Sequence, residues 1–548
     1  MEMKKKLLFS IGVLSMASLL VACSSGKKAT TTKDSASTET AQTLRVLENA
    51  ELPTMDLSLA TDVVSFSAIS QVMEGLYEFA DDSTAQPAMA KEVVEPTNDG
   101  KTYTIPLRED AKWSNGDPVT AHDFVFSWQR TVNPATGGEY AYLFDGFANF
   151  AAIQKGEKDP SELGVKALDD YTLEITLDYP IPYLNSILAK PFMYPLNEKF
   201  VTEKGKDYGT NSDNVLYNGA FTLADWDGTN VSWKYLKNEN FHDADNVKLD
   251  EIDVTVSKED ATNVNLFHAD DVDVVQIKGE FVEQELENPE LVTRIYPSTS
   301  YLQYNFDNEV LKNKNIRQAF NHIIDSEVLT SNILKDGSLP IRAFVPQGIV
   351  NSETGKDFNE EAGELMTLDE KEAQKYWQAG LKELGKDKVE LTLLTSDTDS
   401  AKKISEFIQG VLTENFDGLT VNVSNVPFKN RLDAMSKQDF DFVLAGWAAT
   451  FSDPVDFLQL VQGDNSMNYG KFNNAEFDKL LNDASVTYAT DNAKRWEALL
   501  AAQDIFMEEV AMTPIYQSSE TFLVKERVQG LKYRALGSPY YKNVSIVE

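Results

Sequence analysis

YTIPLREDAKWSNGDPVTAHDF, the segment from Tyr103 to Phe124, combines three local signals that together indicate how the chain folds. Its first residues alternate between polar and apolar side chains, which predicts a strand. The pair Asn115-Gly116 predicts a tight turn, because positive φ angles cost little at these residues. Thr120 stands three residues before Asp123, which predicts a capping box at the start of a helix, AHDFVFSWQR. The segment is therefore expected to form strand, turn and capped helix.

Strands and helices are expected to alternate along the rest of the chain from Leu44 onward. Period-two or continuous apolar runs predict strands at residues 44–48, 171–180, 232–241, 251–260, 389–396, 419–426 and 440–447. Helical spacing of apolar residues predicts helices within residues 62–79, 316–334, 373–384 and 400–416. Strands separated by helices indicate an α/β fold. No repeat with a fixed period is present, so a solenoid is excluded.

The chain is strongly acidic, with 50 Lys and Arg against 87 Asp and Glu and a formal charge of −37. This charge argues against nucleic acid as a partner, because phosphates attract basic residues. The single cysteine excludes an intrachain disulfide and a cysteine zinc site. The histidines are far apart in sequence and lack paired ligand spacing: His122, His242, His268 and His322. Neither a metal nor any other cofactor is therefore expected.

The N-terminus reads MEMKKKLLFSIGVLSMASLLVACSSGKKA, in which three lysines precede an apolar stretch. This pattern predicts a signal peptide over residues 1–22, because the apolar stretch is too short for a membrane span. The end of the stretch, Leu-Val-Ala-Cys, resembles the bacterial lipobox, in which the cysteine is diacylated. Cys23 is the corresponding residue, and two acyl chains suffice for stable anchoring. Residues 23–43 are rich in Ser and Thr and are expected to form a flexible tether.

The sequence contains no phosphate-binding G-x-x-x-x-G-K-[ST], no G-x-G-x-x-G, no H-E-x-x-H and no G-x-S-x-G. An enzyme is therefore not expected. Carboxylate enzymes such as glycosidases need no local motif, so an extracytoplasmic hydrolase or a chaperone-like protein remains an alternative.

The segment Tyr103–Phe124 closely resembles the signature of the large solute-binding proteins that serve peptide, dipeptide and nickel ABC importers. Three further stretches resemble that family in order and spacing: Leu216–Val254, Asn315–Asp325, and GWAATFSDPVDFL at Gly446–Leu458. The resemblance covers essentially the whole chain after the signal peptide. It is greatest to the oligopeptide-binding branch of Gram-positive bacteria.

The resemblance implies a two-lobed, periplasmic-binding-protein-like α/β fold that closes over its ligand in hinge fashion. It implies a first lobe made of residues 44–73, 195–300 and 515–548, an inserted domain at 74–194, and a third domain at 301–514. Together with the lipobox, it implies a monomer on the outer face of the cell membrane. The protein would capture extracellular oligopeptides and deliver them to the transmembrane subunits of an ABC permease.

A receptor for many peptides should bind the groups that all peptides share, which are the backbone N–H and C=O. The resemblance implies that the ligand backbone lies along Gly446, Trp447, Ala448 and Ala449. It also implies ligand contacts from the first loop, at Glu51, Leu52 and Pro53. Tyr301, Gln303 and Asn305 alternate along one predicted strand, and we expect them to point into the cleft. Ordinary packing is the alternative for Trp447 and for this strand face.

Thr450 departs from the family pattern, since many oligopeptide-binding relatives have an aspartate there that pairs with the ligand's α-amine. A hydroxyl cannot neutralise a buried ammonium group. One alternative is that Glu51 or Asp453 supplies the charge. The other is that the ligand differs: it binds in a shifted register, has a blocked N-terminus, or is a dedicated signalling peptide. A pheromone receptor with the same fold is therefore the second hypothesis. Dipeptides, nickel and sugars are less favoured ligands, and the sequence offers nickel no clear site.

Overall fold

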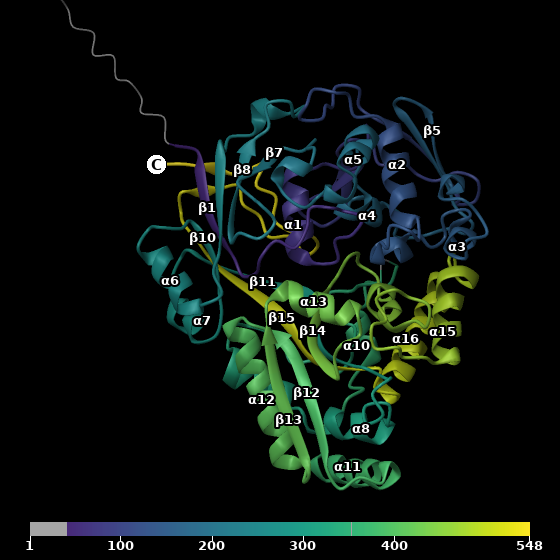
Figure 1. Ribbon diagram of the computed structural model, residues 1–548, viewed down its shortest axis with the longest axis vertical. Coiled ribbons are helices and arrows are strands. Elements are labelled where there is room, and N and C mark those ends of the chain that lie inside the picture. Colours follow the sequence, from purple (N-terminus) through teal and green to yellow (C-terminus); the bar gives the residue numbers. More distant parts are fainter. Residues whose placement is uncertain (1–40, 352) are drawn as a thin grey trace, which may run out of the picture. The chain divides into compact units, whose positions relative to one another are not determined.

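A mixed β-sheet runs through the part of the chain that the computed structural model describes, residues 41–351 and 353–548 (Figure 1). The predicted signal peptide, the predicted lipidation site Cys23 and most of the predicted tether lie outside these residues. Ten strands of the described part form this sheet. In spatial order they are β13 (Leu419–Val426), β12 (Val389–Ser396), β14 (Phe442–Ala448), β11 (Leu291–Tyr304), β15 (Met512–Val524), β10 (Val274–Ile277), β1 (Thr43–Glu48), β9 (Glu251–Val256), β8 (Ser232–Lys237) and β7 (Phe221–Ala224).

The two long strands β11 and β15 connect the two halves of the sheet. They pair with each other antiparallel, and β11 also pairs antiparallel with β14. On one side, β12 is parallel to both β13 and β14. On the other side, β1 is parallel to both β9 and β10. Residues from the start, middle and end of the chain therefore meet in one sheet.

Helices pack against the strands of the sheet. In Figure 1, α12 lies along β12 and β13, while α6 and α7 lie beside β10. The helices are α1 (Val63–Val72), α2 (Ala121–Val132), α3 (Phe150–Gln154), α4 (Leu184–Leu188), α5 (Glu198–Lys204), α6 (Asp260–His268), α7 (Glu280–Glu285), α8 (Lys314–Ile323), α9 (Ser326–Val328), α10 (Phe358–Ala362), α11 (Glu370–Leu384), α12 (Asp399–Asn415), α13 (Phe428–Ser436), α14 (Val455–Leu458), α15 (Ala475–Asn482) and α16 (Asn492–Glu508).

The segment Tyr103–Phe124 folds as the sequence predicts. It contains strand β4 (Thr102–Pro106), which joins β6 (Thr172–Thr176) and β5 (Val165–Asp169) in a small antiparallel sheet. The turn has Gly116 at φ 90°. Helix α2 begins with a capping box, in which the Thr120 N–H donates to the Asp123 carboxylate at 2.8 Å. Two shorter antiparallel pairs, β2 (Tyr77–Phe79) with β3 (Ala85–Pro87) and β16 (Val528–Gln529) with β17 (Ser545–Ile546), complete the strands described.

The other predicted strands and helices occur at the expected places, with three differences. The helical pattern over residues 62–79 forms a helix only at Val63–Val72, and Tyr77–Phe79 form strand β2. The strand expected at residues 251–260 ends at Val256, and Asp260 begins α6. The third difference lies at residues 316–334. The predicted single helix ends at Ile323, because Asp325 begins a new helical segment. The Asp325 carboxylate accepts the N–H groups of Glu327 and Val328, at 2.9 and 3.1 Å. Such side-chain caps compete with a continuous helix. A wide helical turn at Leu329–Leu334 follows.

The α/β class predicted from the sequence is confirmed by this mixed sheet and its helices. The boundaries expected for the three domains stay a prediction. Among the described helices, none combines the length and the apolar character that a membrane crossing requires.

Candidate functional site

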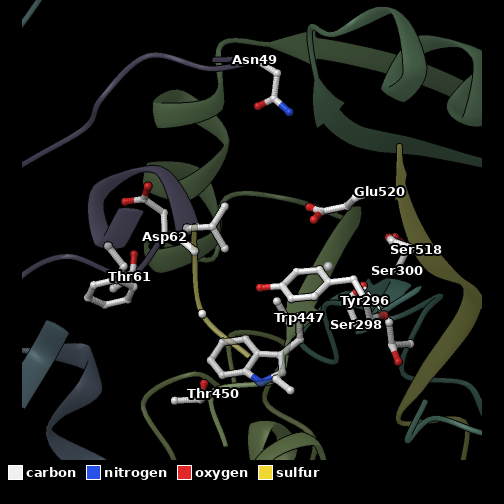
Figure 2. A pocket seen from close by; sticks show the side chains of 18 of the residues that line it. Asn49, Thr61, Asp62, Tyr296, Ser298, Ser300, Trp447, Thr450, Ser518 and Glu520 are labelled. Atoms are coloured by element: carbon white, nitrogen blue, oxygen red, sulfur yellow. Dashed lines mark hydrogen bonds between the residues drawn. The ribbon is translucent and has the colours of Figure 1, made fainter. Parts of the chain in front are cut away.

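A cavity of about 420 Å³ opens between β11, β14, β15, α1 and the segment at residues 189–192. Its volume is in the range of sites that bind small molecules. In Figure 2, Asn49 lies at the top of the view, with Trp447 and Thr450 toward the bottom. Elements that are distant in the sequence thus supply different walls of one chamber.

Strand β14 presents a free backbone edge at this cavity. It pairs with β11 from Phe442 to Ala448, whereas among the described strands β12 meets it only at Phe442 and Val443. The Ala449 N–H donates to the Pro297 carbonyl, on the β11 side, at 2.8 Å. Arg431 donates to the Leu444 carbonyl, which therefore points away from β11.

Backbone groups alternate in direction along a strand, so Gly446 and Ala448 direct their N–H and C=O away from β11. Gly446 is exposed, and both residues line the cavity. A methyl group added at Gly446 would have its nearest heavy atom 3.6 Å away, an ordinary van der Waals contact, so a side chain fits at this position without a clash. An extended chain could add to this edge as a further strand.

Trp447 forms part of the cavity wall together with Tyr140. Their ring centroids lie 6.0 Å apart, and the ring planes make an angle of 22°. Tyr140 belongs to the short helix at Glu139–Phe144, so the stack joins this segment to β14. Trp447 is 6% exposed and its Nε1 has no hydrogen-bond partner in the described residues. Trp447 therefore packs within the protein and lines the cavity at the same time.

Thr450 lies just after β14, where its backbone N–H donates to Asp456 Oδ2 at 2.5 Å. Asp456 is fully buried, and its Oδ1 has no hydrogen-bond partner among the described residues. Burial raises the pKa of Asp456 to about 7, although the Thr450 N–H and the charge of Lys190 oppose this rise. The indole N–H of Trp447 also lowers the pKa of Asp456, although it does not form a hydrogen bond with the carboxylate.

The first loop after β1 contributes Asn49 to the cavity, but Glu51, Leu52 and Pro53 are not among the lining residues. Glu51 accepts from Lys258 Nζ at 2.7 Å, and the same ammonium group contacts Asp397 at 2.9 Å. Leu52 is buried in the core. These partners come from distant parts of the chain, so the loop sequence alone did not predict them.

Asp453 is also occupied by a protein partner. Its two carboxylate oxygens accept from Arg495 at 2.7 and 2.8 Å, and both side chains are buried. Glu51 and Asp453 were the two carboxylates expected to replace an aspartate at position 450. Each forms an ion pair within the protein, and neither lines the cavity.

The residues predicted on β11 and just beyond it do not line the cavity either. Tyr301 and Gln303 are buried at 4% and 2% exposure, and Tyr301 packs against Phe344. Asn305 follows the strand and donates to the Phe440 carbonyl at 2.9 Å. The lining residues of β11 lie earlier, at Tyr296, Ser298, Thr299 and Ser300.

Position along the strand explains this difference. Between Ser298 and Tyr304, β11 pairs with β14 without a break in register, so Tyr301 and Gln303 share a face with Thr299. The cavity reaches only as far as Ser300 on this strand, and Tyr301 lies beyond that point against Phe344. Alternation gives the face of a strand but not where along that face the cavity ends.

Several lining residues were not singled out from the sequence: Asp62, Tyr140, Lys190, Tyr296, Arg431 and Glu520. Asp62 caps α1 by accepting the Ser65 N–H at 2.8 Å, and burial raises its pKa to about 6. Glu520 forms an ion pair with Arg294 at 2.6 Å. Only the Asp62 cap has a local sequence signal, an aspartate directly before a helical pattern.

An α/β fold with a chamber formed by distant segments, and a free strand edge within it, suits the binding of an extended ligand. The chain matches the family described as bacterial extracellular solute-binding proteins, family 5, over residues 84–469, and it belongs to this family. This confirms the family that the sequence resembles.

Named relatives agree with this assignment. A dipeptide-binding protein of Lactococcus lactis subsp. cremoris is 34% identical over 89% of this chain and 92% of its own length. The structure of Listeria monocytogenes OppA bound to peptide is 43% identical, with a TM-score of 0.89 over 93% of this chain and 99% of that one. The structure of the pheromone receptor PrgZ is 33% identical, also with a TM-score of 0.89, over 93% of this chain and all of that one.

Proposed function

We propose that this chain is the substrate-binding subunit of an ABC peptide importer, which captures extracellular oligopeptides between two closing lobes. Cys23 would carry the lipid anchor that holds the monomer at the outer face of the membrane. Residues 44–73, 195–300 and 515–548 would form one lobe, carrying the insert 74–194, and 301–514 the other. The protein would bind and release its ligand without chemical change.

The observation that carries this proposal is the free edge of β14. Gly446 and Ala448 offer backbone donors and acceptors to the cavity, and every peptide has the complementary groups. Binding through the main chain is compatible with many sequences, because it does not depend on the ligand's side chains. The relatives that are named for peptides or bound to peptide support the same class of ligand.

The test removes one donor from this edge. Ala448→Pro eliminates an N–H that faces the cavity and is not required for pairing with β11. We expect peptide affinity to fall by about tenfold or more, since an unpaired backbone group in a bound complex costs roughly 1–3 kcal/mol. Ala448→Ser keeps the N–H and should bind within about threefold of the wild type.

The measurement is isothermal titration with a mixed library of unmodified peptides and with single peptides chosen from it. Equal affinity of the proline variant and the wild type, with the fold intact by circular dichroism, would exclude the β14 edge as the binding edge. Absence of binding by the whole library would exclude the proposed function itself.

A receptor for one signalling peptide is the second candidate. Thr450 favours this candidate, because a threonine carries no charge that could pair with the α-amine common to all unblocked peptides. A named pheromone receptor also shares the fold. Affinity for one sequence at least a hundredfold above a length-matched mixture would support this candidate. Similar affinities across the mixture would support general uptake.

The lipid anchor needs its own experiment. Wild-type protein and Cys23→Ala should be expressed in a Gram-positive host, and the membrane and medium fractions compared. Retention of the wild type on the membrane and release of the variant are expected. Equal retention of both proteins would contradict anchoring through Cys23.

A further inference from the structure

Lys190 is a buried cation in the wall of the cavity. Lys190 belongs to the lining segment of residues 189–192, and the residue is 8% exposed. The ammonium nitrogen lies 4.9 Å from the centre of the Phe79 ring, which also lines the cavity. Within residues 41–351 and 353–548, Lys190 forms no ion pair within 4.0 Å and no hydrogen bond through this nitrogen. Burying a charged group without an ion pair or hydrogen bond costs free energy, unless a bound group supplies the missing partner.

Asp456 is the carboxylate whose charge acts on Lys190, but it lies beyond ion-pair distance. One Asp456 oxygen is already engaged by the Thr450 N–H at 2.5 Å. Burial lowers the pKa of Lys190 to about 8, against the attraction of Asp456. The lysine is therefore mostly protonated at neutral pH.

The other carboxylates of the cavity wall are committed to protein partners. Glu520 pairs with Arg294, and Asp62 caps the first turn of α1. Asp336 accepts the Ser338 N–H at 3.0 Å. None of them forms an ion pair with Lys190 among the described residues. Among the described residues, Lys190 is thus a lining cation without an ion pair, as are Lys278 and Arg431.

We propose that Lys190 binds a carboxylate of the ligand, so that the cavity selects peptides with an acidic group at this wall. The inference rests on the proposed function, since it assumes that a peptide occupies the cavity. A carboxylate would supply the charge-assisted hydrogen bonds that the ammonium lacks. A ligand ammonium group at the same place would add a second cation beside Lys190 and is disfavoured.

The carboxylate can come from an acidic side chain or from the peptide's C-terminus, and two sets of synthetic pentapeptides separate these sources. One set exchanges Glu for Gln at each position of a pentapeptide that binds. The other compares the free C-terminal acid with its amide. We expect one of these exchanges, either Glu to Gln or free acid to amide, to weaken binding of the peptide to the wild-type protein about tenfold to a hundredfold. This is the usual range for a hydrogen bond to a charged group.

Lys190→Met should abolish this difference, because the uncharged side chain keeps similar length and apolar packing. Lys190→Arg should retain most of it. Lys234→Met is the matched control: Lys234 pairs with Glu251 and Asp253 outside the cavity, so the preference should be unchanged. Thr450→Asp should weaken binding of the carboxylate peptide at least tenfold, because it adds a negative charge at the lining.

Two results would overturn the inference alone: peptides bind but no exchange changes the affinity more than twofold, or the preference persists in Lys190→Met. Failure of the entire library to bind would overturn the proposed function, and this inference with it. The two failures are therefore distinguishable in the same titrations.

Discussion

Tyr140 and Trp447 stack with ring centroids 6.0 Å apart, joining a short helix near the α2 segment to strand β14. Both rings line the cavity and both residues are 6% exposed. The stack therefore connects two walls of the binding chamber. A ligand on the edge of β14 lies against a surface whose shape depends on this contact.

A double-mutant cycle should reveal this connection. We expect Tyr140→Leu and Trp447→Leu each to weaken peptide binding, and the double variant to lose less than the sum. The coupling should be about 0.5–1.5 kcal/mol, the usual value for an aromatic pair. Calorimetric affinities of the four proteins provide the measurement, and strict additivity would contradict a role for the stack in shaping the cavity.

Gly446→Val tests whether the ligand backbone lies against β14 at this residue. The nearest heavy atom to an added Cβ is 3.6 Å away, so the variant should fold with its melting temperature within a few degrees of the wild type. Its side chain would enter the space where a ligand backbone is proposed, and peptide affinity should fall at least tenfold. Tight binding by a stable variant would place the peptide elsewhere.

Asp453 is expected to act on stability, in contrast to its predicted role in binding. Asp453→Ala leaves Arg495 buried without a carboxylate, which should lower the free energy of unfolding by about 3–5 kcal/mol. Urea denaturation measures this loss. The double variant Asp453→Leu, Arg495→Met should recover part of it. Weaker peptide binding by Asp453→Ala, with an unchanged free energy of unfolding, would show instead that Asp453 acts in ligand binding.

The pKa of Asp456 predicts a pH dependence of stability. Burial raises this pKa from 3.8 in the unfolded chain to about 7 in the folded one. Between these values the folded protein holds a proton that the unfolded chain has released, so this group's contribution to stability falls as the pH rises from about 4 through 7. Lys190 is the charged neighbour that limits the effect.

Asp456→Asn removes this titration and keeps an oxygen acceptor for the Thr450 N–H. Relative to this variant, the wild type should lose about 2–4 kcal/mol of unfolding free energy between pH 4.5 and pH 8. Urea titrations of both proteins at the two pH values test this. A difference that stays constant with pH would show that Asp456 is ionised throughout.

Local signals in the sequence predicted the elements of the fold well. The Thr120–Asp123 capping box and the turn at Gly116 depend on residues within a few positions, and both occur as expected. Strand β14 was likewise recognisable from its apolar run. The split of the helix after Ile323 was missed because the capping role of Asp325 outweighed a continuous apolar pattern.

The candidate site was predictable only in part. Gly446 to Thr450 line the cavity, as the family resemblance implied, although their contact with a ligand stays a prediction. Asp453 and Glu51 lie outside the cavity lining and pair with Arg495 and Lys258, which are distant in the sequence, so their contact with a ligand stays a prediction.

Contacts between segments that are distant in the sequence also decide which other residues reach the cavity. Tyr301 shares a strand face with Thr299 but packs against Phe344 beyond the end of the cavity, which an alternation pattern does not show. The burial of Lys190 at the cavity wall depends on packing against Phe79, far away along the chain.

Native mass spectrometry of the mature protein, purified without denaturation, tests the central claim most directly. We predict added mass that leaves the protein on unfolding and that fragments as peptides. A protein of ligand-free mass that also fails to bind any member of a peptide library would contradict the account.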